Sequence, residues 1–97
     1  MNVGVEIDGK HELFLRPVVI IRKFNKDMAL VVPTTHQDKS NKYYLDVLGV
    51  NEKMYKACLS QIRTISSKRL LRKIDTVREG QYNILLDKIS KMIQGRL

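Results

Sequence analysis

Apolar residues of this chain fall into short runs separated by turn-forming residues. Residues 17–24 are rich in β-branched side chains, and residues 28–32 are apolar again after the sequence Asn25-Lys26-Asp27. β-Branched runs favour strands, and Asn and Asp favour turns, so this region predicts a hairpin with buried faces. Further strands are expected at residues 43–48, 59–65 and 70–77, with a tight turn at 66–68. Residues 51–57 are polar and compatible with a short helical turn.

A helix is expected after the last strand. Thr76 and Glu79 have the spacing of a capping box, in which a hydroxyl and a carboxylate satisfy the free amides at a helix start. Beyond them, apolar residues recur at steps of three and four and so share one stripe: Tyr82, Leu85, Leu86, Ile89, Met92 and Ile93. We interpret this stripe as the face that packs against the sheet, rather than as a membrane or ligand contact. Gly95 is expected to end the helix.

The chain has the size of one domain. Its 97 residues are too few for two independent cores, so we expect a single domain over residues 1–97. Short strands followed by one terminal helix predict a compact α+β, barrel-like domain. A core this small favours a dimer or a bound partner.

The sequence carries no signal for a membrane, a metal or a cofactor. No run approaches the roughly 20 apolar residues that cross a bilayer, and residues 1–4 are not a signal peptide. Cys58 is the only cysteine, which excludes a disulfide framework and a four-ligand zinc site and fits a reducing cytoplasm. Neither a phosphate loop nor a nucleophile elbow is present. We therefore expect a cytoplasmic protein with no membrane contact, no metal and no cofactor.

Basic residues are in excess and are unevenly placed. The chain has 18 Lys and Arg against 10 Asp and Glu, a formal net charge of +8. Between positions 61 and 78 only Asp75 opposes Arg63, Lys68, Arg69, Arg72, Lys73 and Arg78. Such a field attracts polyanions, so nucleic acid is the first expected partner. The alternatives are a solvated surface and a face for an acidic protein.

Three distant segments each place polar, phosphate-binding residues beside a strand-like run. They are residues 16–21, 32–35 and 60–65. Read together with residues 4–10, their order and spacing resemble the MazF/PemK family of toxin endoribonucleases, from about Asn2 to near Ile93. This resemblance implies a small SH3-like β-barrel with a C-terminal helix, working as a homodimer whose RNA groove crosses the subunit interface.

The resemblance assigns two residues to catalysis. Arg16 matches the Arg-Pro pair that contacts phosphate in the family, and a guanidinium can hold two phosphate oxygens at once. Thr35 matches the hydroxyl residue two positions after the proline that ends a strand, beside the scissile phosphate. Without the resemblance, Arg16 would be read as a surface residue, and Thr35 as a residue that caps a strand end.

Four more residues are assigned to RNA binding by the same resemblance. Gln61, Arg63 and Thr64 match a polar strand along the RNA groove, where an amide reads a base edge and an Arg holds phosphate or stacks on a base. Glu6 matches an acidic residue of the family's first loop, although without the resemblance it would be read as a solvated loop charge.

The chain departs from the family pattern in two respects. Some relatives use a His and an Asp as acid and base where this chain has Val5 and Ser60, and the loop residues His11 and His36 are not assigned their role. Family members also have a strand before the Gly-Glu loop, and residues 1–4 offer nothing to build it. The usual first strand is therefore expected to be missing, which would leave an open sheet edge.

These features predict the toxin of a type II toxin-antitoxin system. The expected activity is sequence-selective, metal-independent cleavage of single-stranded RNA through a 2′,3′-cyclic phosphate, which inhibits growth. An acidic antitoxin is expected to silence it, because an extended acidic tail competes for the groove that binds RNA. Two alternatives stay open: a CcdB-like toxin that inhibits DNA gyrase through its terminal helix, and a non-catalytic RNA-binding module.

Overall fold

The computed structural model describes residues 2–8, 11–38 and 40–97, with side chains described for 17–38, 40–70 and 72–97. Strands make up most of it, and one long helix follows them. In chain order the elements are β1 (Asn2–Asp8), β2 (His11–Lys23), β3 (Met28–Thr35), β4 (Tyr44–Leu48), β5 (Met54–Cys58), η1 (Leu59–Gln61), β6 (Arg63–Ser66), η2 (Ser67–Arg69), β7 (Leu70–Thr76) and α1 (Glu79–Ile93).

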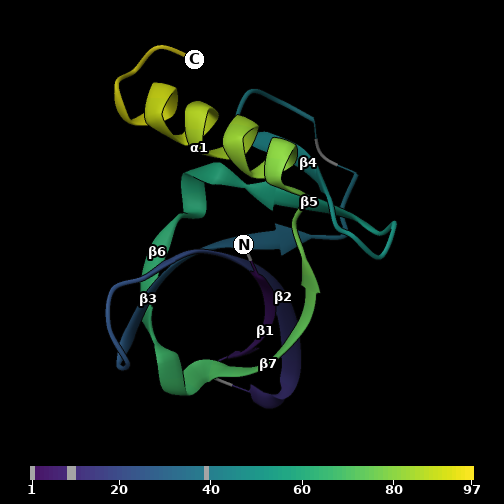
Figure 1. Ribbon diagram of the computed structural model, residues 1–97, viewed down its shortest axis with the longest axis vertical. Helices are drawn as coiled ribbons and strands as arrows, with labels where there is room; N and C mark the ends of the chain where they lie inside the picture. Colours follow the sequence, from purple (N-terminus) through teal and green to yellow (C-terminus); the bar gives the residue numbers. More distant parts are fainter. Residues whose placement is uncertain (1, 9–10, 39) are drawn as a thin grey trace.

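The strands form one antiparallel sheet in the order β4-β5-β3-β2-β1-β7. β6 also pairs with β3, at residues 28–31, before the part of β3 that pairs with β5. The sheet bends so that β1, β2, β3, β6 and β7 surround a common interior, while α1 lies across β4 and β5 (Figure 1). This arrangement confirms the expected α+β fold with a C-terminal helix. Within the described residues, the path of paired strands does not close into a complete barrel.

The predicted hairpin of β2 and β3 is confirmed. Val19 pairs with Val32, and both side chains are fully buried. The connecting turn is held by Asn25, whose side-chain oxygen accepts the backbone N–H groups of Asp27 at 2.8 Å and Met28 at 3.0 Å. An Asx turn of this kind reverses the chain locally, which is why the turn was visible in the sequence.

Three local predictions were wrong. Residues 4–6 lie in β1, which pairs with both β2 and β7, where we expected a loop. Residues 54–58 form β5, where we expected a helical turn. The strand expected at residues 59–65 begins only at Arg63, because the backbone N–H of Ile62 turns back to the carbonyl of Leu59 and closes η1.

The core lies in two layers. The larger cluster packs between the sheet and α1 and contains Val19, Val32, Val47, Tyr55, Ala57, Leu59, Val77, Leu85 and Ile89. The smaller cluster fills the interior of the bent sheet and contains Val18, Ala29, Val31 and Ile65. Neighbouring residues such as Val18 and Val19 belong to different clusters, because successive side chains of a strand point to opposite faces.

Helix α1 confirms the predicted helix but not its predicted cap. Thr76 is the last residue of β7, and the N-cap is Arg78, which makes no side-chain capping bond. Within the predicted stripe, Leu85 and Ile89 are buried, whereas Ile93 is 73% exposed. No helix of the described residues has the length and apolar character needed to span a membrane.

The end of α1 is set by Gly95, as expected. Its φ is +70°, a conformation that favours glycine. The backbone N–H of Gly95 donates to the carbonyl of Met92, and that of Arg96 donates to Lys91. These two bonds make a Schellman motif and satisfy carbonyls that the helix end leaves free.

Candidate nucleic-acid interface

The C-terminal end of β3 lies between β2 and β5. Val18 of β2 pairs with Pro33 of β3, and the Thr34 hydroxyl donates a hydrogen bond of 2.8 Å to the carbonyl of Pro17. Continued by two residues, this antiparallel register places the backbone of Arg16 opposite that of Thr35. The register thus directs two residues that are far apart in the sequence toward neighbouring positions on adjacent strands, two residues beyond the last pair of the ladder. Of Arg16 the structure describes the backbone alone.

Thr35 is the last residue of β3 and is half-buried. Its side-chain oxygen accepts the backbone N–H of Gln37 at 3.1 Å, so the residue does cap the strand end. The hydroxyl can still donate its own hydrogen, because a hydroxyl is both a donor and an acceptor. Capping and contact with a phosphate oxygen are therefore compatible roles for this residue.

The structure separates the predicted RNA-binding residues of the third segment. Arg63 pairs with Val31 and Thr64 with Leu30. Since side chains alternate along a strand and paired residues share a face, Arg63 lies on the face of Thr35, and Thr64 lies on the other. Gln61 is exposed in η1, before the strand begins.

The remaining predicted residue, Glu6, lies in β1 with its backbone opposite Arg16 on one side and Leu70 on the other. It is therefore in a paired strand rather than in a loop. The backbone positions of Glu6, Arg16 and Thr35 follow one another across three adjacent strands.

One residue at this edge was missed by the sequence analysis. Lys56 of β5 pairs with Thr35 in the ladder between β3 and β5. A signal for this strand was present in the sequence, because Lys56 lies between two apolar residues, Tyr55 and Ala57. In the structure these two are buried, whereas Lys56 is not. It was overlooked because residues 51–57 were not recognised as containing a strand.

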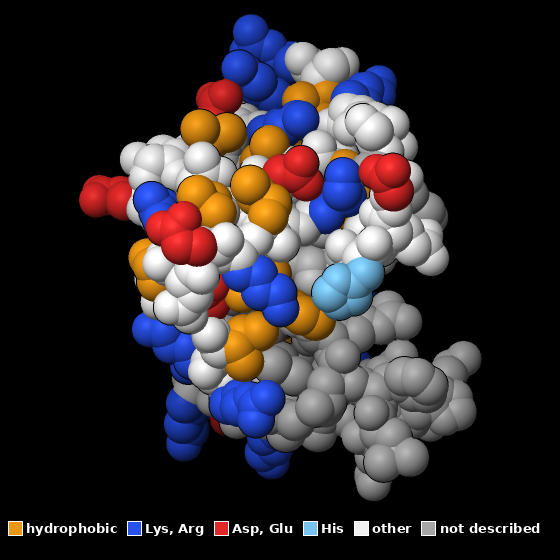
Figure 2. Space-filling view, turned by 90° about the vertical axis from the view of Figure 1, so that its right-hand side faces the viewer, with side chains coloured by type: hydrophobic (Ala, Val, Ile, Leu, Met, Phe, Trp, Pro, Cys, Tyr) orange, Lys and Arg blue, Asp and Glu red, His pale blue; other side chains and the backbone are white. Residues whose placement is uncertain are grey.

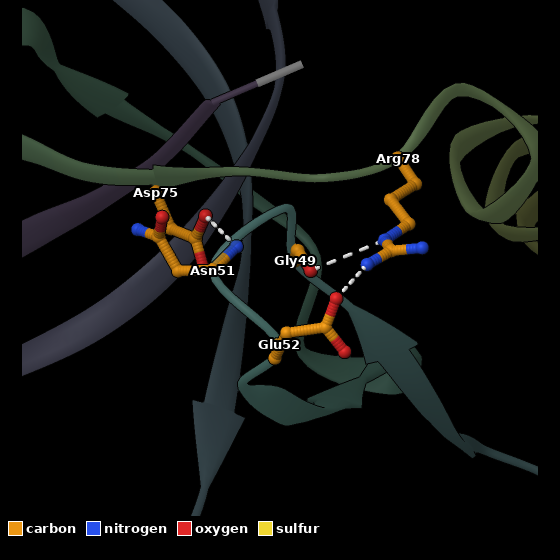
Figure 3. Close-up of polar contacts among 5 residues, drawn as sticks. All are labelled: Gly49, Asn51, Glu52, Asp75 and Arg78. Atoms are coloured by element: carbon orange, nitrogen blue, oxygen red, sulfur yellow. Dashed lines mark hydrogen bonds and ion pairs between the residues drawn. The ribbon is translucent and has the colours of Figure 1, made fainter.

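The basic residues of positions 61–78 do not form one patch. Arg72 and Lys73 are neighbours in β7, so their side chains point to opposite faces. Arg78 forms an ion pair with Glu52 and donates from Nε to the carbonyl of Gly49 at 3.4 Å (Figure 3). On the face shown in Figure 2, Lys and Arg side chains are spread between the two ends of the molecule, with acidic side chains among them.

Asp75 is the buried centre of a second group of polar residues, which we call the Asp75 cluster: Gly49, Asn51, Tyr55, Asp75 and Thr76. Asp75 is 4% exposed. It accepts hydrogen bonds from the Tyr55 hydroxyl at 2.9 Å and from the backbone N–H groups of Thr76 at 2.7 Å and Asn51 at 3.3 Å (Figure 3 shows the last). The cluster fastens the turn between β4 and β5 to the end of β7.

These contacts move the pKa values of both buried groups. Burial raises the pKa of Asp75, but the hydrogen bonds from Thr76, Tyr55 and two further backbone N–H groups outweigh burial and leave this pKa below its ordinary value. Burial, then the hydrogen bond to Asp75 and its charge, raises the pKa of Tyr55 to about 12. At neutral pH the pair is therefore a carboxylate and a neutral phenol.

No three His, Cys, Asp or Glu side chains gather as a metal site in the part of the chain that the structure describes. His36, which follows Thr35, is exposed. The described contacts therefore assign the acid and base of a proton transfer to no residue.

Known toxins share the fold of this chain. The family model described as "PemK-like, MazF-like toxin of type II toxin-antitoxin system" matches residues 2–93. Among solved structures, the Mycobacterium tuberculosis toxin MazF-mt6 aligns with a TM-score of 0.77 at 18% identity, covering 97% of this chain and 97% of that chain. At this identity the likeness shows a common fold. No match was found among curated proteins.

Proposed function

Because the chain belongs to the PemK-like, MazF-like family of toxins of type II toxin-antitoxin systems, we propose that it is an endoribonuclease that cleaves single-stranded RNA without a metal ion. The observation that supports this proposal best is the register of β2 and β3, in which Val18 pairs with Pro33. Continued by two residues, this register brings Arg16 opposite Thr35. The proposal includes a cytoplasmic homodimer that inhibits growth by cutting mRNA and is silenced by an acidic antitoxin.

The proposed reaction needs no group beyond the RNA and the protein. The 2′-hydroxyl of the RNA loses its proton as it attacks the adjacent phosphorus, and the bond from phosphorus to the 5′-oxygen breaks. The leaving 5′-oxygen takes up a proton, and a 2′,3′-cyclic phosphate remains on the other fragment. The protein must align these groups and stabilise the negative charge that gathers on the phosphate oxygens. In this proposal the Arg16 guanidinium binds the two non-bridging oxygens of the phosphate, and the Thr35 hydroxyl donates a hydrogen bond to one of them.

The RNA strand on either side of the cleaved bond would be held by the neighbouring elements. Arg63 is well placed for this task, because it lies on the face of Thr35 and a guanidinium binds phosphate or stacks on a base. Gln61, exposed next to it, would read a base edge. Thr64 lies on the opposite face, and Glu6 follows Arg16 across the sheet, so both would act on other parts of the RNA.

RNA cleavage in the presence of EDTA tests the proposal. Purified protein is incubated with a long RNA, and the 5′ ends are mapped beside those of Arg16→Ala and Thr35→Ala. We expect cleavage at a few sequence-related positions, and a loss of about 100-fold or more in each variant. Cleavage abolished by EDTA would contradict the metal-independent mechanism. Unchanged rates in both variants would contradict the site, and gyrase inhibition without RNA cleavage would select the alternative toxin activity.

A further inference from the structure

Lys56 lies beside Thr35 on the neighbouring strand and has no part in the proposed reaction as described so far. We propose that its ammonium group binds an RNA phosphate next to the one held at Thr35, so that the site has a second cation of its own. This inference rests on the proposed function, because it gives that same site an additional substrate contact.

The ladder between β3 and β5 fixes the direction of Lys56. Thr35 pairs with Lys56, and Thr34 pairs with Ala57. Tyr55 and Ala57, on either side of Lys56, are buried in the core cluster beneath α1. Because side chains alternate along a strand, Lys56 points away from that cluster, to the same face as Thr35. Directly paired residues have Cβ atoms about 5 Å apart, so both side chains can reach one phosphodiester segment.

Asp46 of β4 holds the lysine in this direction. It pairs with Lys56 in the next ladder, and Oδ1 of Asp46 lies 3.5 Å from Nζ of Lys56. The Lys56 side chain is only 23% exposed, whereas that of Asp46 is 55% exposed. An ion pair with so exposed a carboxylate contributes at most about 1 kcal/mol, so a phosphate can take the place of the carboxylate. Asp46 thus orients the ammonium without blocking it.

The position of Lys56 also completes a row of cationic residues. One edge of β3 is shared by β5, which pairs at Thr35, and by β6, which pairs at Val31. Lys56 and Arg63 therefore approach the same edge of β3, on the same face as Thr35. Arg16 follows on the opposite edge by the register of β2. A backbone of repeated phosphates matches this spacing of cations along adjacent strands better than a single anion does.

The test compares Lys56→Gln with Lys91→Gln, which removes the same charge and breaks the same kind of pair on α1, where Lys91 lies 3.0 Å from Asp87. Binding of a short fluorescent single-stranded RNA is measured against salt in a Thr35→Ala background, and cleavage is measured in the otherwise unchanged protein. We expect Lys56→Gln to bind about fivefold more weakly near 0.1 M salt and to lower the slope of log K against log salt by about 0.7. Cleavage should fall at least as much.

Two further variants separate charge from structure. Lys56→Arg should restore the slope, since it keeps the cation. Asp46→Asn should bind RNA no more weakly than the parent, since it removes a carboxylate that competes with phosphate for Lys56. Equal slopes and equal cleavage in Lys56→Gln and Lys91→Gln would overturn the inference while leaving the proposed function intact. A Lys56-dependent slope in a protein that binds RNA without cutting it would support the inference and contradict the nuclease. Absence of RNA binding by the wild type would contradict both.

Discussion

The two polar regions of the molecule differ in where their hydrogen-bonding groups are directed. In the Asp75 cluster, a buried carboxylate is surrounded by donors from three segments of the same chain. At the end of β3, Thr35 is only half-buried, and Lys56 pairs with an exposed carboxylate. The first region uses its polar groups to fix the shape of the protein, whereas the second leaves its polar groups partly accessible to solvent. Variants in the two regions should therefore affect different measurements, stability in the first and RNA cleavage in the second.

The largest effect on stability is expected from Gly49→Ala in the Asp75 cluster. A Cβ atom at this position would lie 2.1 Å from Oδ2 of Asp75, so the carboxylate would have to leave its donors. Overpacking against a buried, hydrogen-bonded group should lower the free energy of unfolding by about 3 kcal/mol. Urea denaturation measures this change, and the cleavage rate per folded molecule should stay near that of the wild type.

The matched control for this substitution is Gly80→Ala. No heavy atom lies within 4 Å of the added Cβ atom, and the residue is in the first turn of α1. The same chemical change should therefore raise the free energy of unfolding by about 0.5 kcal/mol, because alanine favours a helix. Equal effects of the two substitutions would show that the close approach to Asp75 is not what requires glycine at position 49.

A smaller loss is expected from Tyr55→Phe, which removes one donor to Asp75. A hydrogen bond to a buried carboxylate contributes about 2 kcal/mol, and the loss should be measurable at neutral pH. The pKa of Tyr55 is raised to about 12 in the folded protein, against about 10 when unfolded, so the stabilisation is complete below pH 10 and is lost as the pH rises toward 12. The difference between wild type and variant should shrink over that interval.

At acidic pH the sign is reversed for Asp75, whose pKa is lowered on folding. The contribution of Asp75 to the free energy of unfolding is fully present above the ordinary carboxyl pKa, about 4. It is lost as the pH falls toward the lowered pKa of Asp75 in the folded protein. Because Tyr55→Phe weakens the hydrogen bonding that lowers this pKa, the variant should lose stability at a higher pH than the wild type. Parallel stability curves for the two proteins below pH 4 would contradict this coupling.

Thr34→Val tests whether one side chain serves both the stability of the fold and the proposed site. Its hydroxyl joins β3 to the carbonyl of Pro17, next to both proposed catalytic residues. Replacing the hydroxyl by a methyl should cost about 1 kcal/mol of stability, because the carbonyl loses its donor. It should also lower kcat by about tenfold through the altered alignment of Arg16 and Thr35. Thr34→Ser, which keeps the hydroxyl, should recover most of kcat, and a loss of stability without any change in kcat would assign Thr34 to the fold alone.

The same contrast explains how far the sequence could predict this molecule. The β2–β3 hairpin was predictable because its turn and its β-branched strands are local signals, and the proposed proximity of Arg16 and Thr35 rests on continuing the register of that hairpin by two residues. The Asp75 cluster was not predictable, because it joins residues 49–55 to residues 75 and 76, and no local pattern in the sequence reports such contacts. Thr76 was wrongly predicted to be a helix cap. It is the last residue of β7 and belongs to the Asp75 cluster, a position that also depends on contacts distant in the sequence.

The candidate site was predictable only in part. Family resemblance led to Arg16 and Thr35. Recognising Lys56 requires recognising β5, and this strand was missed because the more exposed residues Met54 and Lys56 alternate with the buried residues Tyr55 and Ala57 and make the segment look polar. Arg63 and Thr64 seemed equivalent in the sequence, and only the register of β6 places them on opposite faces. Assigning faces to residues requires strand boundaries that are correct to one position.

The smallest effects are expected at Glu52, on the exposed rim of the Asp75 cluster. Its φ of +66° is uncommon for a residue with a side chain, and its carboxylate pairs with Arg78 while both side chains are well exposed. Glu52→Gln keeps the backbone and removes the charge, so it should cost at most about 0.5 kcal/mol at low salt and less in 1 M salt. Glu52→Gly loses the ion pair but removes the strain of a positive φ, a gain of about 1 kcal/mol, so it should be about 0.5 kcal/mol more stable than the wild type.

Thermal unfolding of both Glu52 variants at two salt concentrations measures these changes in stability. A glycine variant less stable than the glutamine variant would contradict the expected gain from the backbone, because both variants lack the ion pair.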